Sequence, residues 1–184
     1  GAALWLERAE RKGAGGVMRL IECSIAGFGA FSDYRITFDE GLNVILQPNG
    51  WGKTTLAAFV KAMLYGFGRK RVRDVSENER LRYLPWEGKS YGGSLDFEFD
   101  GRAYRVVRKF GKTAAGDTLV VIDIDSGQKV DVGDGEVGEW LFGLDSNAFQ
   151  KSVFVGQNGF GFDGSTSGLR SRLNALVNEA DDVA

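Results

Sequence analysis

The chain has 184 residues, a formal net charge of −2, and a composition with 43% hydrophobic and 26% charged residues. These values are close to globular averages, so they exclude a chain that is disordered throughout. The chain has no histidine and a single cysteine, Cys23. Ser-His-Asp catalysis, histidine or multi-cysteine metal sites and a disulfide framework are therefore excluded within one chain. The apolar runs are far shorter than the roughly 20 residues of a membrane helix, which predicts a cytoplasmic protein with no membrane partner.

The first predicted elements are strands that lead to a glycine-rich loop. Residues 1–17 are rich in Ala, Gly and Arg, and we interpret them as an upstream extension or a vector-derived remnant. Apolar and polar residues alternate over 19–25 and again over 34–38, as they do in half-buried strands. The short apolar run 42–46 predicts a buried central strand.

A helix and an antiparallel meander are predicted next. Apolar residues recur at helical spacing over 56–64, which predicts a helix. The apolar residues of 69–94 show no regular spacing, so a long loop is expected there. Asp100-Gly101 is a hairpin signal between two alternating runs, so an antiparallel β lobe is expected over 95–132. A second helical stripe covers 137–144.

The last predicted elements are a short strand at 152–155, which leads to Gln157, and a sparse apolar stripe over 166–184. This stripe predicts the start of a helical, coiled-coil segment. The expected organisation is therefore the extension 1–17, one α/β domain over 18–165, and this helical segment.

The loop between the 42–46 strand and the following helix carries the strongest chemical signal. Its glycines let successive backbone N–H groups converge on phosphate oxygens, and the helix start adds a partial charge of about +0.5. Lys53 is expected to place its ammonium over the outer phosphates, and the Thr54 hydroxyl is a suitable Mg²⁺ ligand. The predicted phosphate-binding residues are Asn49, Gly50, Trp51, Gly52, Lys53, Thr54 and Thr55.

One residue departs from the phosphate-loop pattern. The pattern G-x-x-x-x-G-K-[ST] has glycine where this chain has Gln47. A non-glycine residue is tolerated there if its φ stays negative. The alternative interpretation is a glycine turn before a helix with an incidental lysine. The strand, the glycines, the Lys-Thr-Thr run and the helix together favour nucleotide phosphate binding.

Positive charge is concentrated in the middle of the chain. Residues 69–112 hold 12 Lys/Arg and 7 Asp/Glu, whereas the rest of the chain is acidic. This asymmetry fits either a polyanionic partner or a solvated loop and hairpin.

These motifs together resemble a known family. A short strand with a Gly/Phe loop at 25–31, an acidic-Gly turn at 39–42 and P-N-G-x-G-K-T-T at 48–55 resemble the N-terminal half of ABC-type ATPase heads of the SbcC, RecN and SMC class. The stretch 80–97 is similar to the YhaN-like bacterial branch, and Trp51 replaces the serine usual in the family's loop. The fold implied is an α/β P-loop NTPase half-head, with a mixed sheet around the P-loop helix and an antiparallel β lobe.

The resemblance also implies ligands, partners and site residues. It implies ATP and Mg²⁺ as cofactors, with Gln157 as the Q-loop glutamine that helps to bind Mg²⁺ and with Lys53 and Gln157 assisting catalysis. It implies that a C-terminal half supplies the signature motif and the Walker B glutamate, which this sequence lacks, and that hydrolysis requires that half. Two heads are expected to enclose two ATP molecules in a head-to-head homodimer. In such relatives the cycle drives DNA repair or chromosome handling, with DNA and a metallophosphoesterase nuclease as further partners.

Two other functions stay open at this point. Residues 119–123 (L-V-V-I-D) look like a Walker B strand, so the chain could be a self-contained P-loop NTPase or kinase with Asp123 on Mg²⁺. That run continues into a turn and precedes Gln157, which is the wrong order for the family. The other alternative is a non-catalytic interaction module that holds nucleotide as part of its structure.

Overall fold

A computed structural model describes residues 17–67, 78–87, 90–133 and 136–152. The chain divides into two compact units, 1–149 and 150–184, and the first contains all of the described strands. Its strands are β1 (Met18–Phe28), β2 (Phe31–Thr37), β3 (Gly92–Phe99), β4 (Arg102–Lys109), β5 (Thr118–Asp123) and β6 (Lys129–Val130). Its helices are α2 (Lys53–Tyr65), α3 (Glu79–Arg82), α4 (Val137–Phe142), the start of α5 (Ser146–Ser152), and the 3₁₀ turn η1 (Ala114–Gly116).

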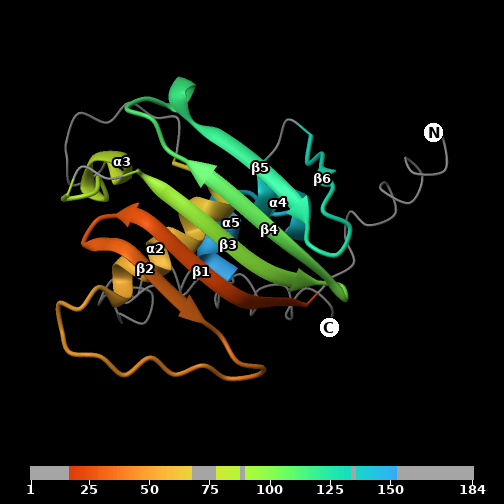
Figure 1. The fold of residues 1–184 in the computed structure, drawn as a ribbon, viewed down its shortest axis with the longest axis horizontal. Helices are drawn as coiled ribbons and strands as arrows, with labels where there is room; N and C mark the ends of the chain where they lie inside the picture. Colours follow the sequence, from red (N-terminus) through yellow and green to blue (C-terminus); the bar gives the residue numbers. More distant parts are fainter. Residues whose placement is uncertain (1–16, 68–77, 88–89, 134–135, 153–184) are drawn as a thin grey trace, which may run out of the picture. The chain divides into compact units, whose positions relative to one another are not determined.

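The strands form one six-stranded sheet with the order β2-β1-β3-β4-β5-β6, and every pairing within it is antiparallel (Figure 1). The predicted hairpin at Asp100-Gly101 is confirmed, since both residues have positive φ, of 50° and 73°, as a tight two-residue turn requires. The antiparallel lobe expected over 95–132 is thus part of a larger sheet that continues into β1 and β2. The expected mixed sheet around the P-loop helix is absent among the described residues.

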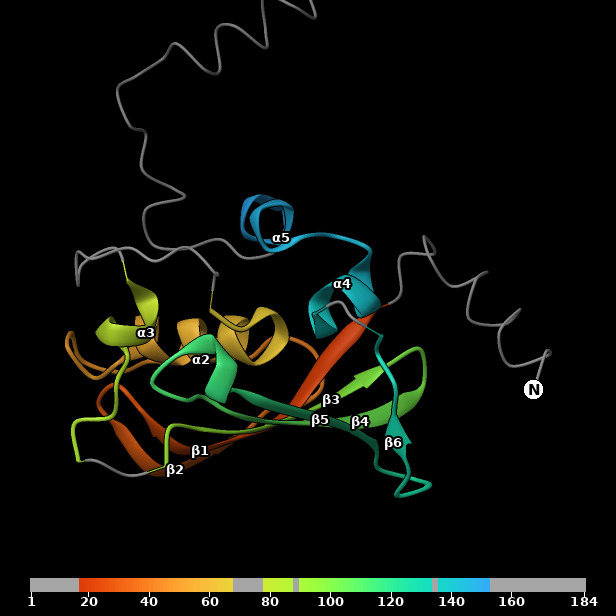
Figure 2. The ribbon, with the colours of Figure 1, turned by 90° about the horizontal axis from the view of Figure 1, so that it is seen from above.

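One face of the sheet carries the helices. Figure 2 shows α2 and α4 on the same side of the strands. The side chains of Cys23, Ile25 and Phe28 on β1 lie on this side, and each is at most 1% exposed. The ring of Phe28 meets Phe59 of α2 edge to face at 5.4 Å. This packing confirms the predicted amphipathic helix, whose apolar side covers the sheet.

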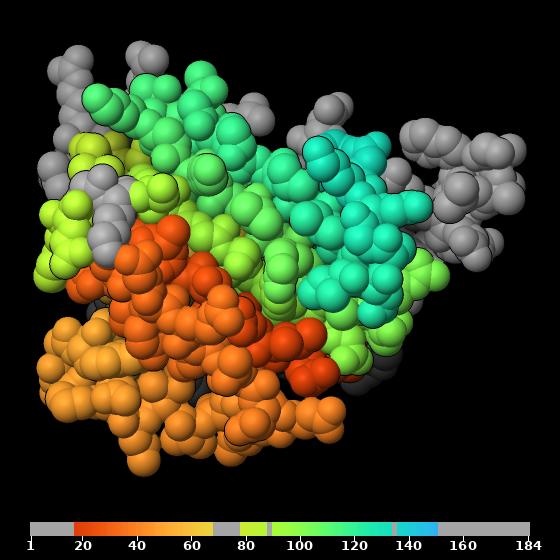
Figure 3. All heavy atoms as spheres, viewed as in Figure 1, coloured from red at the N-terminus to blue at the C-terminus, as the bar shows by residue number. Residues whose placement is uncertain are grey.

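The opposite face, toward the viewer in Figures 1 and 3, carries strand side chains, and among the described residues no helix covers it. Alternation along the strands places polar residues here. Arg105 on β4 binds both carboxylate oxygens of Asp96 on β3, and Arg19 on β1 binds Glu98 at 2.8 Å. Opposite charges on neighbouring strands thus form ion pairs on this face.

The predicted central strand 42–46 is wrong for the described structure. These residues follow β2 as an extended segment outside the sheet, with Leu42 and Leu46 more than 80% exposed. An apolar strand becomes buried only when other strands and helices flank it, and the described residues place none beside this segment.

Three further expectations differ in their boundaries or fall outside the described residues. The 69–94 segment contains the short helix α3 and the start of β3. Ser152, the first residue of the expected 152–155 strand, ends α5 instead, because the preceding residues continue the helix that begins at Ser146. Residues 1–16, Gln157 and the 166–184 helical segment lie outside the described residues. The helix predicted over 137–144 is confirmed as α4.

Candidate nucleotide phosphate site

The loop before α2 is a tight turn followed by a left-handed glycine. The backbone N–H of Trp51 donates to the carbonyl of Pro48 at 3.3 Å, and Gly50 has φ +86° at the third turn position, where a type II turn requires a positive φ. Gly52 has φ +117° and caps the helix, with its carbonyl accepting the first helical bond from Leu56 at 2.8 Å. These two angles bring the chain sharply into α2.

Helix α2 presents its positive end at this loop. It is 13 residues long, it has no acidic residue in its first turn, and its N-terminal cap, Gly52, has no side chain to accept a bond from the first N–H groups. The partial positive charge of its first turn is therefore not neutralised from within the helix, which makes this end suitable for an anion.

Lys53 lies at the same place. Its ammonium donates to the backbone carbonyls of Gln47 at 2.6 Å and Pro48 at 3.1 Å, so it bends back over the loop. Both Lys53 and Thr54 are exposed. Gln47 has a negative φ, since Asp33 and Asp100 are the only described non-glycine residues with positive φ. Position 47 therefore meets the condition of a negative φ, under which a residue other than glycine is tolerated there.

Helix α3 and the residues after it brace the turn beside the loop. Gly29, between β1 and β2, donates to the carbonyl of Tyr83 at 2.8 Å and accepts from the N–H of Trp86 at 3.3 Å. A β-carbon at Gly29 would lie 3.0 Å from the methyl group of Thr55, so this turn touches the first turn of α2. The α3 segment therefore contacts the β1–β2 turn, and this turn contacts the first turn of α2.

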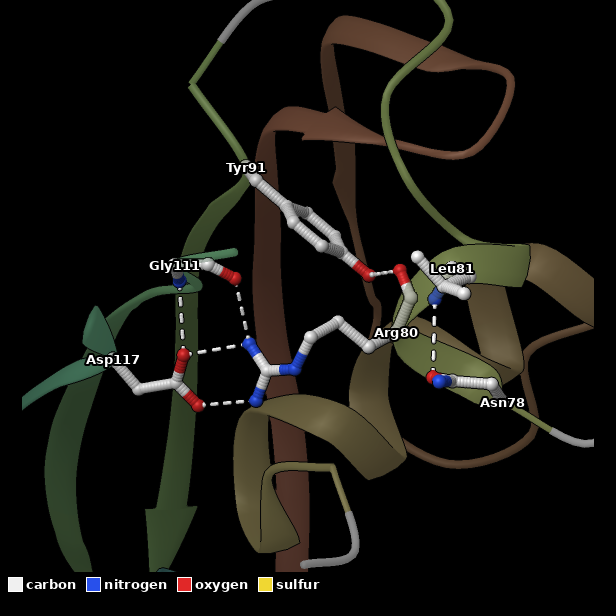
Figure 4. Close-up of polar contacts among 6 residues, drawn as sticks. All are labelled: Asn78, Arg80, Leu81, Tyr91, Gly111 and Asp117. Atoms are coloured by element: carbon white, nitrogen blue, oxygen red, sulfur yellow. Dashed lines mark hydrogen bonds and ion pairs between the residues drawn. The ribbon is translucent and has the colours of Figure 1, made fainter. Parts of the chain in front are cut away.

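A network of polar contacts holds α3 in place (Figure 4). Arg80 binds both carboxylate oxygens of Asp117, each at 2.7 Å, and also donates to the carbonyl of Gly111 at 2.8 Å. The Tyr91 hydroxyl donates to the carbonyl of Arg80, and the Asn78 side chain caps the helix at Leu81. A four-residue helix is unstable alone, so these contacts provide most of its stability.

The chain matches the protein family described as AAA domain over residues 22–180. It belongs to this family. It is 29% identical over 122 residues to the DNA double-strand break repair Rad50 ATPase of Archaeoglobus fulgidus, covering 66% of this chain and 12% of that protein. It is 32% identical over 139 residues to the Rad50 ATPase of Methanopyrus kandleri, covering 72% and 15%. The uncharacterized protein YhaN of Bacillus subtilis is 28% identical over 138 residues, covering 74% and 13%.

These matches confirm the resemblance to the N-terminal region of SbcC/Rad50/SMC-like ATPases, and they include the YhaN-like branch. This AAA domain sequence spans about one eighth of the length of the first curated relatives that it matches, or 12–16%. Among the described residues, no helix is long and apolar enough to cross a membrane.

Asp123 does not join the phosphate site. The sheet register places Gly27, Gly92, Lys109 and Thr118 at one level, next to the β1–β2 turn. Asp123 lies five residues farther along β5, or about 17 Å at the usual rise of about 3.4 Å per residue. Its carboxylate accepts the N–H of Ser126 in the β5–β6 turn, and this bond lowers its pKa. The Walker B interpretation of Asp123 is therefore wrong for this structure.

The sequence did not reveal two features of the site. One is the short helix α3, which supports the β1–β2 turn. A four-residue helix has too few turns to show a periodic pattern of apolar residues. The other is an aromatic cluster of Phe31, Tyr34 and Trp51 beside the loop. The aromatic residues were visible as residue types, but no spacing rule links β2 to a loop about 20 residues downstream. Gln157, the candidate Q-loop glutamine, lies outside the described residues.

Proposed function

We propose that residues 49–55 of this AAA domain bind the phosphates of Mg²⁺–ATP. The observation that carries the proposal is the placement of Lys53, whose ammonium bends over the loop at the positive end of α2. On binding, this ammonium exchanges the carbonyls of Gln47 and Pro48 for phosphate oxygens. Membership of an ATPase family supports a nucleotide as the anion.

We assign the magnesium ligands from side-chain chemistry. The Thr54 hydroxyl follows Lys53 directly and is exposed, so it is free to bind the ion. The amide oxygen of Gln157 is the second protein ligand that the resemblance implies. Hard oxygen donors of this kind suit Mg²⁺, which keeps several of its waters.

Hydrolysis is proposed to require a C-terminal half of the same ATPase, which carries the signature motif and the Walker B glutamate. The exposed apolar segment 42–46 supports this requirement, because alternate residues there, Leu42, Val44 and Leu46, are 66–89% exposed. Pairing with strands of that half would bury them. A head-to-head homodimer with ATP at its interface is the corresponding active form.

The biological output that we propose is DNA repair or chromosome handling in the cytoplasm, with DNA and a metallophosphoesterase nuclease as partners. The support is the similarity to two Rad50 ATPases of DNA double-strand break repair, at 29% and 32% identity.

Binding of Mg²⁺–ATP to the full chain tests the proposed site. Replacing Lys53 with alanine should weaken binding by about 10- to 100-fold, since a charge-assisted hydrogen bond contributes about 1.5–3 kcal/mol. Lys129→Ala, which removes an exposed lysine on β6, is the matched control and should bind like the wild type. Equal affinity in Lys53→Ala would contradict the assignment.

Turnover separates the catalytic models. The chain alone should bind ATP without hydrolysing it, and hydrolysis should appear when the C-terminal half is added. Nucleotide that stays bound and intact after that addition would instead indicate a non-catalytic nucleotide-binding module.

A further inference from the structure

Trp51 lies inside the phosphate loop, between Gly50 and Gly52, yet its side chain packs on the β1–β2 hairpin. Its indole meets Phe31 edge to face at 5.3 Å and 72°, and meets Tyr34 edge to face at 5.8 Å and 79°. Phe31 and Tyr34 are themselves stacked at 4.8 Å. One loop residue is thus held by two rings from β2, which favours a fixed geometry.

The hairpin also contacts the loop backbone. A β-carbon added to Gly52 would lie 2.9 Å from the tip of the Phe31 ring, so this ring occupies the space that a side chain would fill. Phe31 is only 7% exposed, whereas Trp51 is half-buried. The hairpin therefore supports the loop at two successive residues, directly before Lys53.

An unsupported glycine loop samples many backbone conformations, and ordering it on ligand binding costs entropy. A side chain anchored outside the loop removes part of that cost before the ligand arrives. Trp51 is also distinctive, since the resemblance places a serine at this position, and a serine cannot reach two rings with an apolar surface.

We propose that Trp51 is a positioning residue that holds the phosphate loop in its binding conformation by anchoring it to Phe31 and Tyr34. This inference rests on the proposed function. The Trp51 side chain acts through the hairpin and does not itself touch the nucleotide.

The test compares two ligands that share phosphates but differ in the base. Affinities of the full chain for Mg²⁺–ATP and Mg²⁺–tripolyphosphate are measured for the wild type, Trp51→Ala and Trp51→Phe. Trp51→Ala should lower the affinity for both ligands equally, by about tenfold, since the loss of each aromatic pair lowers affinity by about two- to tenfold. Trp51→Phe should restore affinity to within about threefold of the wild type, because a phenyl ring keeps part of the contact.

Trp140→Ala is the matched control. Trp140 on α4 makes the same edge-to-face contact with Tyr104 at 5.4 Å, but away from the loop, so its loss should leave both affinities unchanged. Tyr34→Leu is a second variant in case Trp51→Ala does not fold. It should weaken the binding of both ligands by about threefold, because it removes one of the two ring contacts of Trp51.

Each other result overturns the inference. Unchanged affinity in Trp51→Ala and in Tyr34→Leu would show that the anchor does not position the loop. Loss confined to Mg²⁺–ATP would show that the indole stacks on the base instead. A wild-type chain that binds neither ligand would overturn the proposed function, and with it this inference.

Discussion

At the phosphate loop, two glycines and one lysine determine the geometry. Gly50 and Gly52 have positive φ values that other residues rarely adopt, and Lys53 follows at the first position of α2. The sequence pattern predicted these three residues and their order. It could not predict the carbonyl partners of Lys53, because these depend on how the loop curls.

Replacing Gly52 with alanine tests the loop conformation. The new β-carbon would meet the Phe31 ring at 2.9 Å and would also be strained at φ +117°, so we expect Mg²⁺–ATP affinity to fall at least tenfold, or about 1.4 kcal/mol. Gly101→Ala is the control, since Gly101 also has a positive φ, of 73°, but lies in open space at the β3–β4 turn. Equal affinities for the two variants, measured by titration, would contradict this account of Gly52.

The reactivity of the Cys23 thiol and its dependence on pH test whether this side chain is buried in the core. Burial raises the pKa of its thiol from 9.0 to about 12, so the thiol should resist alkylation in the folded chain and react after denaturation. Because the folded pKa lies above the unfolded one, this group's contribution to stability is complete below about pH 9 and is lost as the pH rises toward 12. Rapid labelling of the native chain at pH 8, followed by mass spectrometry, would contradict the burial.

Among the elements, strands with alternation and a clear turn were predictable, and short or unpaired ones were not. The β3–β4 hairpin followed from Asp100-Gly101, and α2 followed from its apolar stripe. Helix α3 escaped prediction because tertiary contacts rather than local propensity stabilise it. The 42–46 segment has the composition of a buried strand, but burial depends on neighbours that the local sequence does not specify.

The ion pair that holds α3 should contribute measurably to stability. The Arg80 and Asp117 side chains are only 12% and 19% exposed and bond in a bidentate manner. We expect Arg80→Ala to lower the free energy of unfolding by about 2–3 kcal/mol, because it leaves a largely buried carboxylate without its partner.

A double-mutant cycle with Asp117→Ala gives the coupling within this pair, which should exceed 1 kcal/mol, as for residues in one network. The Arg19–Glu98 pair, at 34% and 40% exposed, is the control, and its coupling should be about 0–1 kcal/mol. Coupling energies are measured by urea denaturation, and equal values for the two pairs would contradict the proposed stabilisation of α3 by Arg80.

On the scale of the whole described unit, one antiparallel sheet has helices on one face, and an exposed apolar segment leads from β2 to the phosphate loop. The motif order along the chain predicted the family, and the family match confirms it. The sequence could not show that the described strands form a sheet without the 42–46 segment.

Substitution in that segment should separate folding from assembly. Leu42→Ser combined with Leu46→Ser should leave the thermal stability of this chain nearly unchanged, since exposed side chains usually contribute within about 0.5 kcal/mol. The same variant should bind the C-terminal half more weakly. Leu95→Ser, at a fully buried position, is the control and should destabilise the chain by more than 2 kcal/mol. Global unfolding of the Leu42/Leu46 variant would contradict the observed exposure.

Amide hydrogen exchange of the full chain, with and without Mg²⁺–ATP, is the most direct test of the central claim. The backbone N–H groups of 50–55 should become protected when nucleotide is present, because they bond to phosphate oxygens. Exchange across the β5–β6 turn that contains Asp123 should not change. Bound nucleotide without protection of 50–55 would contradict the assignment of this loop as the phosphate site.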